Sequence, residues 1–431
     1  MADITVIGGG IIGVCSAIAL QAEGYSVEII DRGLPEEGAT YGNCGILAAG
    51  EVVPLARPGI LTKIPKWLLD PHGPLFVRPR DFLGQIPWLM EFLWAGRRSR
   101  VLEIANALAP LLQHAEDDYR ELLEKTNIAG SLISTETIMA FNSRADYEKD
   151  KFTWDLRARH GLKHRFLGLS DLRSIEPALQ GRITCGALLE GWLRFSEPGL
   201  VWQRLTQFFV SYGGRIRIGN ADCIEVDGGR ATGVRLADGQ FVKVKQLVVC
   251  AGAWSGRLVK SLGIRIPVAA LQGYHNHLPH PGIKLNNAVL YANGGFVVTP
   301  MQSGIRVGGT IEIAHPDSKP NLSRADIITR KALDILPGLQ IAGGKQWMGP
   351  HPSMPDSMPV IGCAPHHQNV VLAFGHGQIG MTLGATTAKI VADLVTGRRP
   401  SLELGPFNAS RFGDHSPESL RAAQVAALAP L

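Results

Sequence analysis

A glycine motif between two apolar runs at the start of the chain constrains its fold more than any other feature. The run Ile4–Ile7 leads into G-x-G-x-x-G at residues 8–13, a long apolar segment follows, and a second run, Val27–Ile30, ends at Asp31. Strand, glycine turn, helix, strand and acid within about 30 residues is the arrangement that binds a dinucleotide. The sequence therefore predicts a parallel α/β domain with a dinucleotide site, against the alternative of a tight turn without a ligand.

The chemistry needs each part of this motif. Gly8 permits the tight turn, Gly10 lets the backbone approach a pyrophosphate, and Gly13 lets helix and strand pack closely. The helix N-terminus presents free N–H groups to phosphates. Asp31 can accept hydrogen bonds from a ribose diol, which argues against NADP and leaves NAD and FAD open.

Three later segments are typical of the walls of a cofactor site. A small-residue loop at 38–46 suits a backbone wrapped around phosphates or a flat ring, or else is a flexible loop. A buried-strand run ends in the small-residue turn 251–253, and another, Val370–Phe374, ends in the glycine loop 375–382 before a helix. Four prolines between residues 349 and 362 predict a rigid irregular loop beside them.

The middle of the chain has a different character. Residues 131–185 and 268–346 carry strand-like runs and several polar and aromatic residues, which predicts a substrate-facing sheet. The segment Arg78–Arg100 has an apolar face and a basic end. It predicts either an interfacial membrane helix or, the interpretation that we favour, a packed helix with a solvated basic end.

Composition excludes several classes of function. The 431 residues are 45% hydrophobic and 19% charged, so a disordered chain is excluded. The net charge is +5 (43 basic and 38 acidic residues) without a dense basic block, which does not suit nucleic acid. The six scattered cysteines have no metal-ligand spacing, so no metal is expected. With neither a signal peptide nor a long apolar span in the sequence, we expect a cytoplasmic protein.

Taken in order, these motifs resemble a known family. The glycine motif, the loop at Thr40–Gly45, the turn Cys250–Trp254, the Gly349–Gly362 stretch and the Gly375–Thr382 loop are similar to the FAD-dependent D-amino-acid oxidase/dehydrogenase (DAO) superfamily. The resemblance runs from about residue 3 to 412 and is strongest to bacterial D-amino-acid dehydrogenases.

The resemblance implies an α/β (α+β) fold with two domains that are discontinuous in sequence. A Rossmann-like FAD-binding domain would comprise residues 1–60, 186–267 and 347–413. A mixed-sheet substrate domain would comprise 61–185 and 268–346, and 414–431 would be a C-terminal tail.

The resemblance also implies which residues hold FAD. They are Gly8, Gly10, Ile11, Ile12 and Gly13; Asp31 and Arg32; Thr40, Asn43, Gly45, Ile46 and Leu47; Cys223; Ala251, Gly252 and Trp254; and Gly377, Gln378, Ile379, Gly380, Met381 and Thr382.

Two departures from the family pattern bear on the chemistry. Relatives read G-x-R-P where this chain has His351, and an arginine fork binds a carboxylate better than histidine does. Sarcosine-oxidase relatives carry a lysine near the flavin and a cysteine that tethers it. This chain has Arg306 on the matching strand and no cysteine in residues 353–356. We therefore expect noncovalent FAD and poor oxygen reactivity.

The resulting hypothesis is oxidation of the C–N bond of a D-amino acid or of a cyclic or N-substituted relative. Hydride transfer to flavin would give an imine and then a 2-oxo acid, with electrons passed to an acceptor such as quinone. The candidate catalytic residues are Tyr274 as a hydrogen-bonding anchor, His351 as carboxylate contact or proton acceptor, and His376 as support. In the alternative interpretation, Tyr274 is a core tyrosine and the histidines brace their loops.

Other functions remain open from the sequence. An oxidase of the same family would pass electrons to oxygen, and a secondary-amine dehydrogenase for D-hydroxyproline, proline or an opine would suit the loss of the arginine. A non-catalytic subunit of a hetero-oligomer is a third alternative, and a nicotinamide dehydrogenase would leave the later glycine loops without a role. Peripheral attachment to the inner face of the membrane rests on the Trp88–Arg100 segment.

Overall fold

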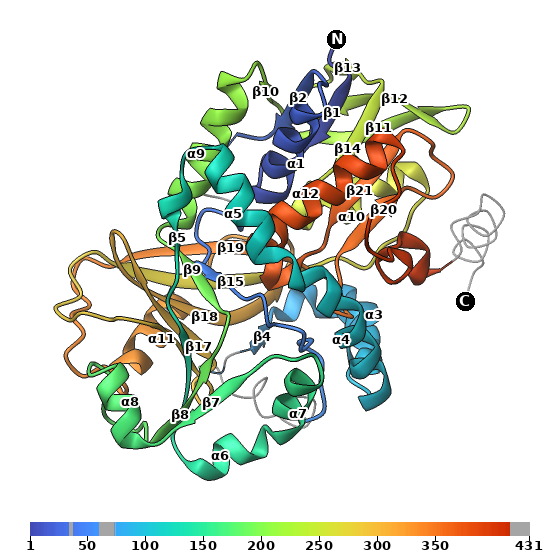
Figure 1. Cartoon of the computed structure of the whole chain (residues 1–431). Coiled ribbons are helices and arrows are strands. Elements are labelled where there is room, and N and C mark those ends of the chain that lie inside the picture. The colour runs from blue at the N-terminus through green and yellow to red at the C-terminus, as the bar shows by residue number, and fades with distance from the viewer. Residues whose placement is uncertain (34–37, 60–72, 74, 414–431) are drawn as a thin grey trace.

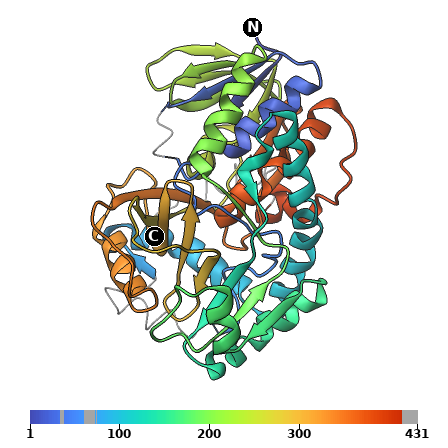
Figure 2. The same cartoon turned by 60° about the vertical axis from the view of Figure 1, so that its left-hand side comes forward.

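A computed structural model describes residues 1–33, 38–59, 73 and 75–413. It shows an α/β fold in which a largely parallel sheet and a larger mixed sheet stand at opposite ends of the molecule (Figures 1 and 2). The predicted fold class is confirmed. The boundary at 60/61 and the tail 414–431 lie outside the described residues.

The first sheet has six strands, and its order brings the glycine-bearing strand ends to one edge. In spatial order the strands are β10 (Arg215–Ile218), β2 (Val27–Asp31), β1 (Ile4–Ile7), β14 (Gln246–Val249), β21 (Val370–Phe374) and β20 (Val360–Cys363). All neighbours are parallel except β20, which runs antiparallel to β21. Because β1, β14 and β21 are adjacent and parallel, the turns after them meet, as the order of motifs predicts.

Both faces of this sheet are covered. On one face lie α1 (Ile11–Ala22), α5 (Ala115–Lys125), α9 (Pro198–Ser211) and α12 (Gly380–Thr396), which share an apolar core with β1 and β2. On the other lies a three-stranded antiparallel sheet of β11 (Ala221–Asp227), β12 (Arg230–Leu236) and β13 (Phe241–Lys243), with α10 (Ser255–Leu258). Burial on both faces explains the nearly continuous apolar runs of the parallel strands.

The second sheet has nine strands. Its path runs through β19 (Lys345–Ser353), β15 (Ala269–Leu278), β18 (Gly304–Ala314), β17 (Phe296–Met301), β16 (Ala288–Tyr291), β6 (Thr137–Phe141), β8 (Cys185–Leu189) and β7 (His164–Leu167), with β4 (Leu75–Val77) paired to β18. Helices α8 (Leu169–Ile175) and α11 (Ser323–Leu333) contribute to the core on one face.

Smaller elements link the two sheets. A three-stranded sheet is made of β3 (Ile46–Leu47), β9 (Leu193–Phe195) and β5 (Leu132–Ile133). Helices α3 (Phe82–Ala95) and α4 (Arg98–Gln113) lie at the edge of the molecule in Figure 1, and α6 (Arg144–Lys149) and α7 (Lys151–Arg159) follow beside the nine-stranded sheet.

The structure corrects the first part of the prediction for the proline-rich stretch, whereas residues 354–359, between β19 and β20, form no helix or strand, as predicted. Residues 345–353 form strand β19 rather than an irregular loop, even though Pro350 and Pro352 lie within it. The strand is at the edge of the nine-stranded sheet and pairs only with β15 among the described strands. Proline lacks an N–H donor, which an edge strand tolerates. Two expected domain boundaries, 185/186 and 346/347, therefore fall inside strands of this sheet.

Candidate active site

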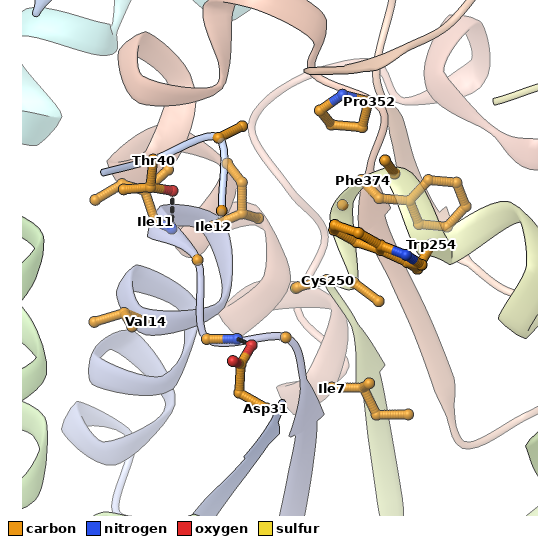
Figure 3. A pocket seen from close by; sticks show the side chains of 18 of the residues that line it. Ile7, Ile11, Ile12, Val14, Asp31, Thr40, Cys250, Trp254, Pro352 and Phe374 are labelled. Atoms are coloured by element: carbon orange, nitrogen blue, oxygen red, sulfur yellow. Dashed lines mark hydrogen bonds between the residues drawn. The ribbon is translucent and has the colours of Figure 1, made fainter. Parts of the chain in front are cut away.

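The turns at the edge of the parallel sheet enclose a cavity of about 410 Å³. Its wall is assembled from the glycine motif, the end of β2, the loop at 38–43, the turn at 250–254, the end of β19 and residues 373–381 (Figure 3). Segments hundreds of residues apart in the chain thus share one chamber, which reaches from the dinucleotide motif to the second sheet.

The glycines of the N-terminal motif are required by contact. Gly8 has φ of +104°, and a Cβ there would lie 2.3 Å from the carbonyl oxygen of Cys250. A Cβ on Gly13 would lie 1.8 Å from the carbonyl oxygen of Gly8, so helix and strand could not pack as they do. Gly10 is the N-cap of α1 and offers no side-chain cap, which leaves N–H groups of the first turn for a ligand.

Two polar side chains shape this end of the cavity (Figure 3). The Asp31 carboxylate accepts the N–H of Gly9 at 2.6 Å and that of Gly33 at 2.9 Å. The Thr40 hydroxyl accepts the N–H of Ile11 at 3.0 Å. Each Asp31 oxygen keeps a further lone pair, so the carboxylate is fixed in place and can still accept from a ribose.

Arg32 and Trp254 form a side wall. The guanidinium carbon of Arg32 lies 3.5 Å from the centroid of the Trp254 ring, and Arg32 pairs with Asp317 at 3.7 Å. The indole N–H of Trp254 donates to Asp317 at 2.7 Å. Asp317 was not predicted from the sequence, because it follows β18 of the other sheet and belongs to no motif.

His351 stands where β19 meets the cavity. Its Nδ1 lies 3.4 Å from the carbonyl oxygen of Gly377. Its ring lies against Gly273, where a Cβ would be only 2.6 Å from His351 Nε2. Burial lowers the pKa of the imidazole, so the neutral form is favoured. A carbonyl can only accept, so the contact with Gly377 requires the proton on Nδ1 and leaves the Nε2 lone pair available.

His376 lies beside it and is 2% exposed. Its Nε2 is 3.0 Å from the hydroxyl of Thr387, and burial lowers the pKa of the ring to about 3. Nδ1 of His376 has no hydrogen-bond partner among the described residues, although the side chain lines the cavity. The ring is therefore neutral and buried, held by Thr387 through Nε2.

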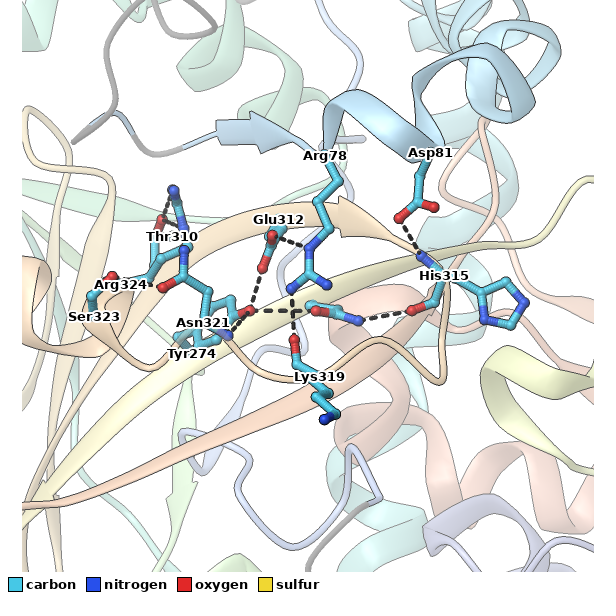
Figure 4. Close-up of polar contacts among 11 residues, drawn as sticks. Arg78, Asp81, Tyr274, Thr310, Glu312, His315, Lys319, Asn321, Ser323 and Arg324 are labelled. Carbon is cyan, nitrogen blue, oxygen red and sulfur yellow. Dashed lines mark hydrogen bonds and ion pairs between the residues drawn. The ribbon is translucent and has the colours of Figure 1, made fainter.

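Tyr274 does not reach this cavity, which corrects its expected role as substrate anchor. Its hydroxyl is buried in a network behind the sheet, where it is hydrogen-bonded to Glu312 and accepts the N–H of Asn321 at 3.1 Å (Figure 4). Glu312 pairs with Arg78 at 2.7 Å. Burial and the Glu312 carboxylate raise the pKa of the phenol, so it stays protonated. Tyr274 therefore fits the alternative interpretation, a core tyrosine whose hydroxyl is satisfied.

Most of the predicted site residues line the cavity, and the others lie outside its lining. The predicted residues in the lining are Gly8, Gly10, Ile11, Ile12, Asp31, Arg32, Thr40, Asn43, Ala251, Gly252, Trp254, His351, His376, Gly377, Gly380 and Met381. Those outside it are Gly13, Gly45, Ile46, Leu47, Cys223, Tyr274, Gln378, Ile379 and Thr382.

For three of these residues the structure shows why they lie outside the lining. Gly13 serves helix packing, and the hydroxyl of Thr382 accepts the N–H of Ala48 at 3.1 Å, which ties α12 to the loop after β3. In β11 the cavity touches Ala221 rather than Cys223, next to an irregularity in the pairing between them.

One further lining residue was not anticipated from the sequence. Trp202 of α9 donates its indole N–H to the carbonyl oxygen of Gly9 at 2.7 Å, a contact without a sequence signal because it joins an isolated residue to a distant backbone. Arg306, which the sequence places where relatives carry a lysine, lies outside the lining. It donates to the carbonyl oxygen of Asn43 and pairs with Glu197 at 2.8 Å.

The chamber fits FAD. Its glycines leave room for a pyrophosphate, Asp31 can take a ribose, and His351 and His376 line the end of the chamber nearest the second sheet. Across the described residues there is no group of three or more His, Cys, Asp or Glu side chains that could hold a metal ion. None of the helices formed by these residues is long and apolar enough to cross a membrane.

Comparison with known proteins agrees with this geometry. The fold and chamber are those of a dinucleotide-dependent oxidoreductase. The model of the DAO family, FAD-dependent oxidoreductases, matches residues 3–394, so the chain belongs to this family and its cofactor is FAD. The predicted family is confirmed.

Particular relatives show where the chain stands in that family. It is 34% identical over 416 residues to a D-amino-acid oxidase of Bradyrhizobium diazoefficiens, covering 95% of this chain and 98% of that one. Glycine oxidase of Geobacillus kaustophilus has a similar fold, with a TM-score of 0.75 at 19% identity, over 95% of this chain and 98% of that one. L-Proline dehydrogenase of P. horikoshii has a TM-score of 0.72 at 17% identity, over 95% and 97%. The finer likeness to bacterial D-amino-acid dehydrogenases stays a prediction.

Proposed function

We propose that this protein oxidises the C–N bond of a D-amino acid, or of a cyclic or N-substituted amino acid, to an imine that water hydrolyses to a 2-oxo acid. The observation that carries the proposal is one chamber with two different ends. The glycine turn 8–10, the N-terminus of α1 and Asp31 form a dinucleotide cradle at one end, and the neutral His351 lies at the other. The 34% identity to a D-amino-acid oxidase supports the substrate class.

The residues of the cradle would hold the cofactor noncovalently. The turn at Gly8–Gly10 and the N-terminus of α1 would take the pyrophosphate, and Asp31 the adenosine ribose. Thr40, Asn43, Gly377, Gly380 and Met381 would contact the remainder of the cofactor. When bound, FAD supplies the acceptor for the hydride that leaves the substrate carbon.

His351 is suited to hold a proton. Oxidation of an amine by hydride loss requires the neutral amine, so an ammonium substrate must first give up a proton. The Nε2 lone pair of His351 can accept that proton, while Nδ1–H holds the ring on Gly377. The same orientation makes His351 a poor carboxylate ligand, because its one N–H is already engaged.

A second candidate, a secondary-amine dehydrogenase, is favoured by the charge of the chamber. Arg32, at the nucleotide end, is the one arginine or lysine in the described lining. A carboxylate near His351 would therefore lack a bidentate guanidinium partner. A cyclic or N-substituted substrate, held more by shape than by its carboxylate, fits this wall.

Electrons would then pass to an acceptor other than oxygen. Sarcosine-oxidase relatives carry a lysine near the flavin, but the described lining of this chamber contains no lysine. Arg306, at the matching position, lies outside the lining, where Glu197 and Asn43 engage its guanidinium. A small amino-acid-like substrate and a separate electron carrier are therefore the expected partners.

The experiment is an anaerobic visible titration of the purified holoprotein with D-amino acids, hydroxyprolines and N-substituted glycines. Bleaching of the flavin band by primary D-amino acids supports the first proposal, and bleaching by secondary amines alone supports the second. Flavin that no amine bleaches contradicts both. Oxygen uptake at the rate of bleaching would contradict the choice of acceptor.

A further inference from the structure

One helix departs from the usual division between a buried apolar face and a solvated polar one. In α3, the side chains of Phe82, Leu83, Ile86, Met90, Leu93 and Trp94 are all exposed. Leu83 is 77% exposed, Met90 61% and Trp94 51%. No other helix of the described chain exposes more than one large apolar side chain.

The exposed side chains form a continuous stripe. At 3.6 residues per turn, the six positions fall within about one third of the helix circumference. The opposite side holds the buried Trp88 and Ala95, with Phe92 stacked on Trp88 at 5.1 Å between ring centroids. The helix is thus anchored to the protein by one apolar face and presents a second one outward. We call the six residues the α3 stripe.

Charge surrounds the stripe asymmetrically. Within α3 the one charged residue is Glu91, whereas Arg97, Arg98 and Arg100 follow immediately after it. Arg97 and Arg98 are exposed, and Arg100 lies 5.5 Å from the centroid of the Trp94 ring. An exposed apolar face that ends in arginines is the pattern of a helix lying in a bilayer interface.

A hollow of about 310 Å³ lies next to this basic end, between α4 and α7. Its charged lining residues are Arg98, Lys151, Arg159 and Asp155, beside the apolar Leu102, Phe152 and Leu156. Asp155 pairs with Lys151 at 3.1 Å, so the two arginines give the hollow its excess positive charge, which would attract a phosphate-bearing headgroup. Arg98 belongs both to this lining and to the basic segment that follows α3, so an apolar contact and an anion contact meet at one place.

We propose that the α3 stripe and its basic end dock on a bilayer surface that carries anionic headgroups. The stripe would lie among the acyl chains near the interface, and the arginines would extend to the headgroups. The indole N–H of Trp88 donates to the carbonyl oxygen of Ser353 at 3.1 Å, in the strand that carries His351. The bilayer contact would thus lie beside the substrate end of the chamber, which suits an acceptor dissolved in the membrane.

The test is sedimentation of the holoprotein with phosphatidylcholine vesicles that contain or lack phosphatidylglycerol. We expect binding to the anionic vesicles, weaker binding at high salt, and at least about tenfold weaker binding for Leu83→Gln/Met90→Gln/Trp94→Gln. The control is Val210→Gln/Tyr212→Gln/Ile341→Gln, which replaces three exposed apolar side chains elsewhere. It should stay within twofold of wild type.

A second variant tests the charge separately and does not touch the stripe. Arg98→Gln/Lys151→Gln should reduce binding to anionic vesicles severalfold and leave any residual binding to neutral vesicles unchanged. Flavin content and thermal midpoint report whether each variant is folded, independently of substrate. Failure of the wild-type protein to bind anionic vesicles overturns the proposal, as does equal binding by the stripe variant. Dimerisation that the stripe variant abolishes, without vesicle binding, would assign the stripe to a second copy of the chain and also overturn it.

Discussion

The two ends of the chamber are built in different ways. The nucleotide end consists mainly of backbone: glycines that leave room, N–H groups at the start of α1, and one carboxylate held by two backbone donors. The substrate end consists of side chains, His351 from β19 and His376 from the loop after β21. The shape of the nucleotide end depends on glycines, that is, on positions without a side chain. The shape of the substrate end depends on the register between strands that are far apart in the sequence.

The largest expected effect is at the nucleotide end. Gly13→Ala would place a Cβ 1.8 Å from the carbonyl oxygen of Gly8, so α1 must move away from β1. We expect FAD affinity to fall by at least about 100-fold or the protein to be insoluble, because overpacking by backbone contact cannot relax locally. Flavin retention on gel filtration measures it. Gly84→Ala, in helix α3 with open space around it, is the control and should retain flavin.

His351→Asn tests the side-chain end. We expect kcat/KM to fall by about 100-fold, the scale of a lost proton acceptor, with flavin content unchanged. Burial lowers the pKa of His351, and its neutral form is the active one, so wild-type kcat/KM should decline as pH falls through that lowered pKa. This acid limb should vanish in the variant. His280→Asn, an exposed histidine, should keep it, and an unchanged limb in His351→Asn would contradict the role.

Gly273→Ala probes the register between β15 and β19. The added Cβ would lie 2.6 Å from Nε2 of His351 and must turn the imidazole away. We expect kcat/KM to fall about tenfold, mostly in kcat, since a misplaced group costs rate rather than binding. Adding Gly273→Ala to His351→Asn should cost little more, because the residue it displaces is gone. Additive effects of the two changes would show that Gly273 acts on something else.

At the ribose the expected effect is confined to cofactor affinity and leaves turnover unchanged. Asp31→Asn keeps the shape of the side chain but replaces one acceptor oxygen with a donor that faces the N–H of Gly9 or Gly33. FAD should bind about tenfold more weakly, while kcat at saturating FAD stays unchanged. A flavin titration of apoprotein measures the affinity. The control is Asp171→Asn, on the exposed first turn of α8, which should bind FAD with the same affinity as the wild-type protein.

The same division explains what could be predicted from the sequence. Gly8, Gly10, Gly13 and Asp31 occupy fixed spacings, because one short strand–turn–helix unit contains them all. The pairing of Leu271 with His351 across two strands has no such local signal. Tyr274 shows the consequence of this missing signal. Its strand was expected, but the face of the sheet to which a side chain points depends on the alternation along the strand and on the bulge between Gly273 and Tyr274. As a result, the Tyr274 side chain does not reach the chamber.

The prediction of an irregular loop at the prolines of β19 was wrong for a physical reason. Proline argues against a central strand, but an edge strand needs donors on only one side. Where the resemblance leads one to expect an arginine, the chain has a histidine whose orientation depends on Gly377, in the loop that follows β21 of the other sheet. Such a residue can be noticed in the sequence, but its role is decided by what the fold brings against it.

A single backbone bridge between Ser353 and His376 joins the edge of the nine-stranded sheet to the loop at the end of β21. Ser353 follows His351 by two residues, and Gly377, which holds His351, follows His376. This pairing ties the backbone of the strand that carries His351 to the backbone of the loop that carries His376. The spacing of the two imidazoles is thus set by the main chain of both segments as well as by side-chain contacts. A change of register at this bridge would be transmitted directly to the place where the proton is held.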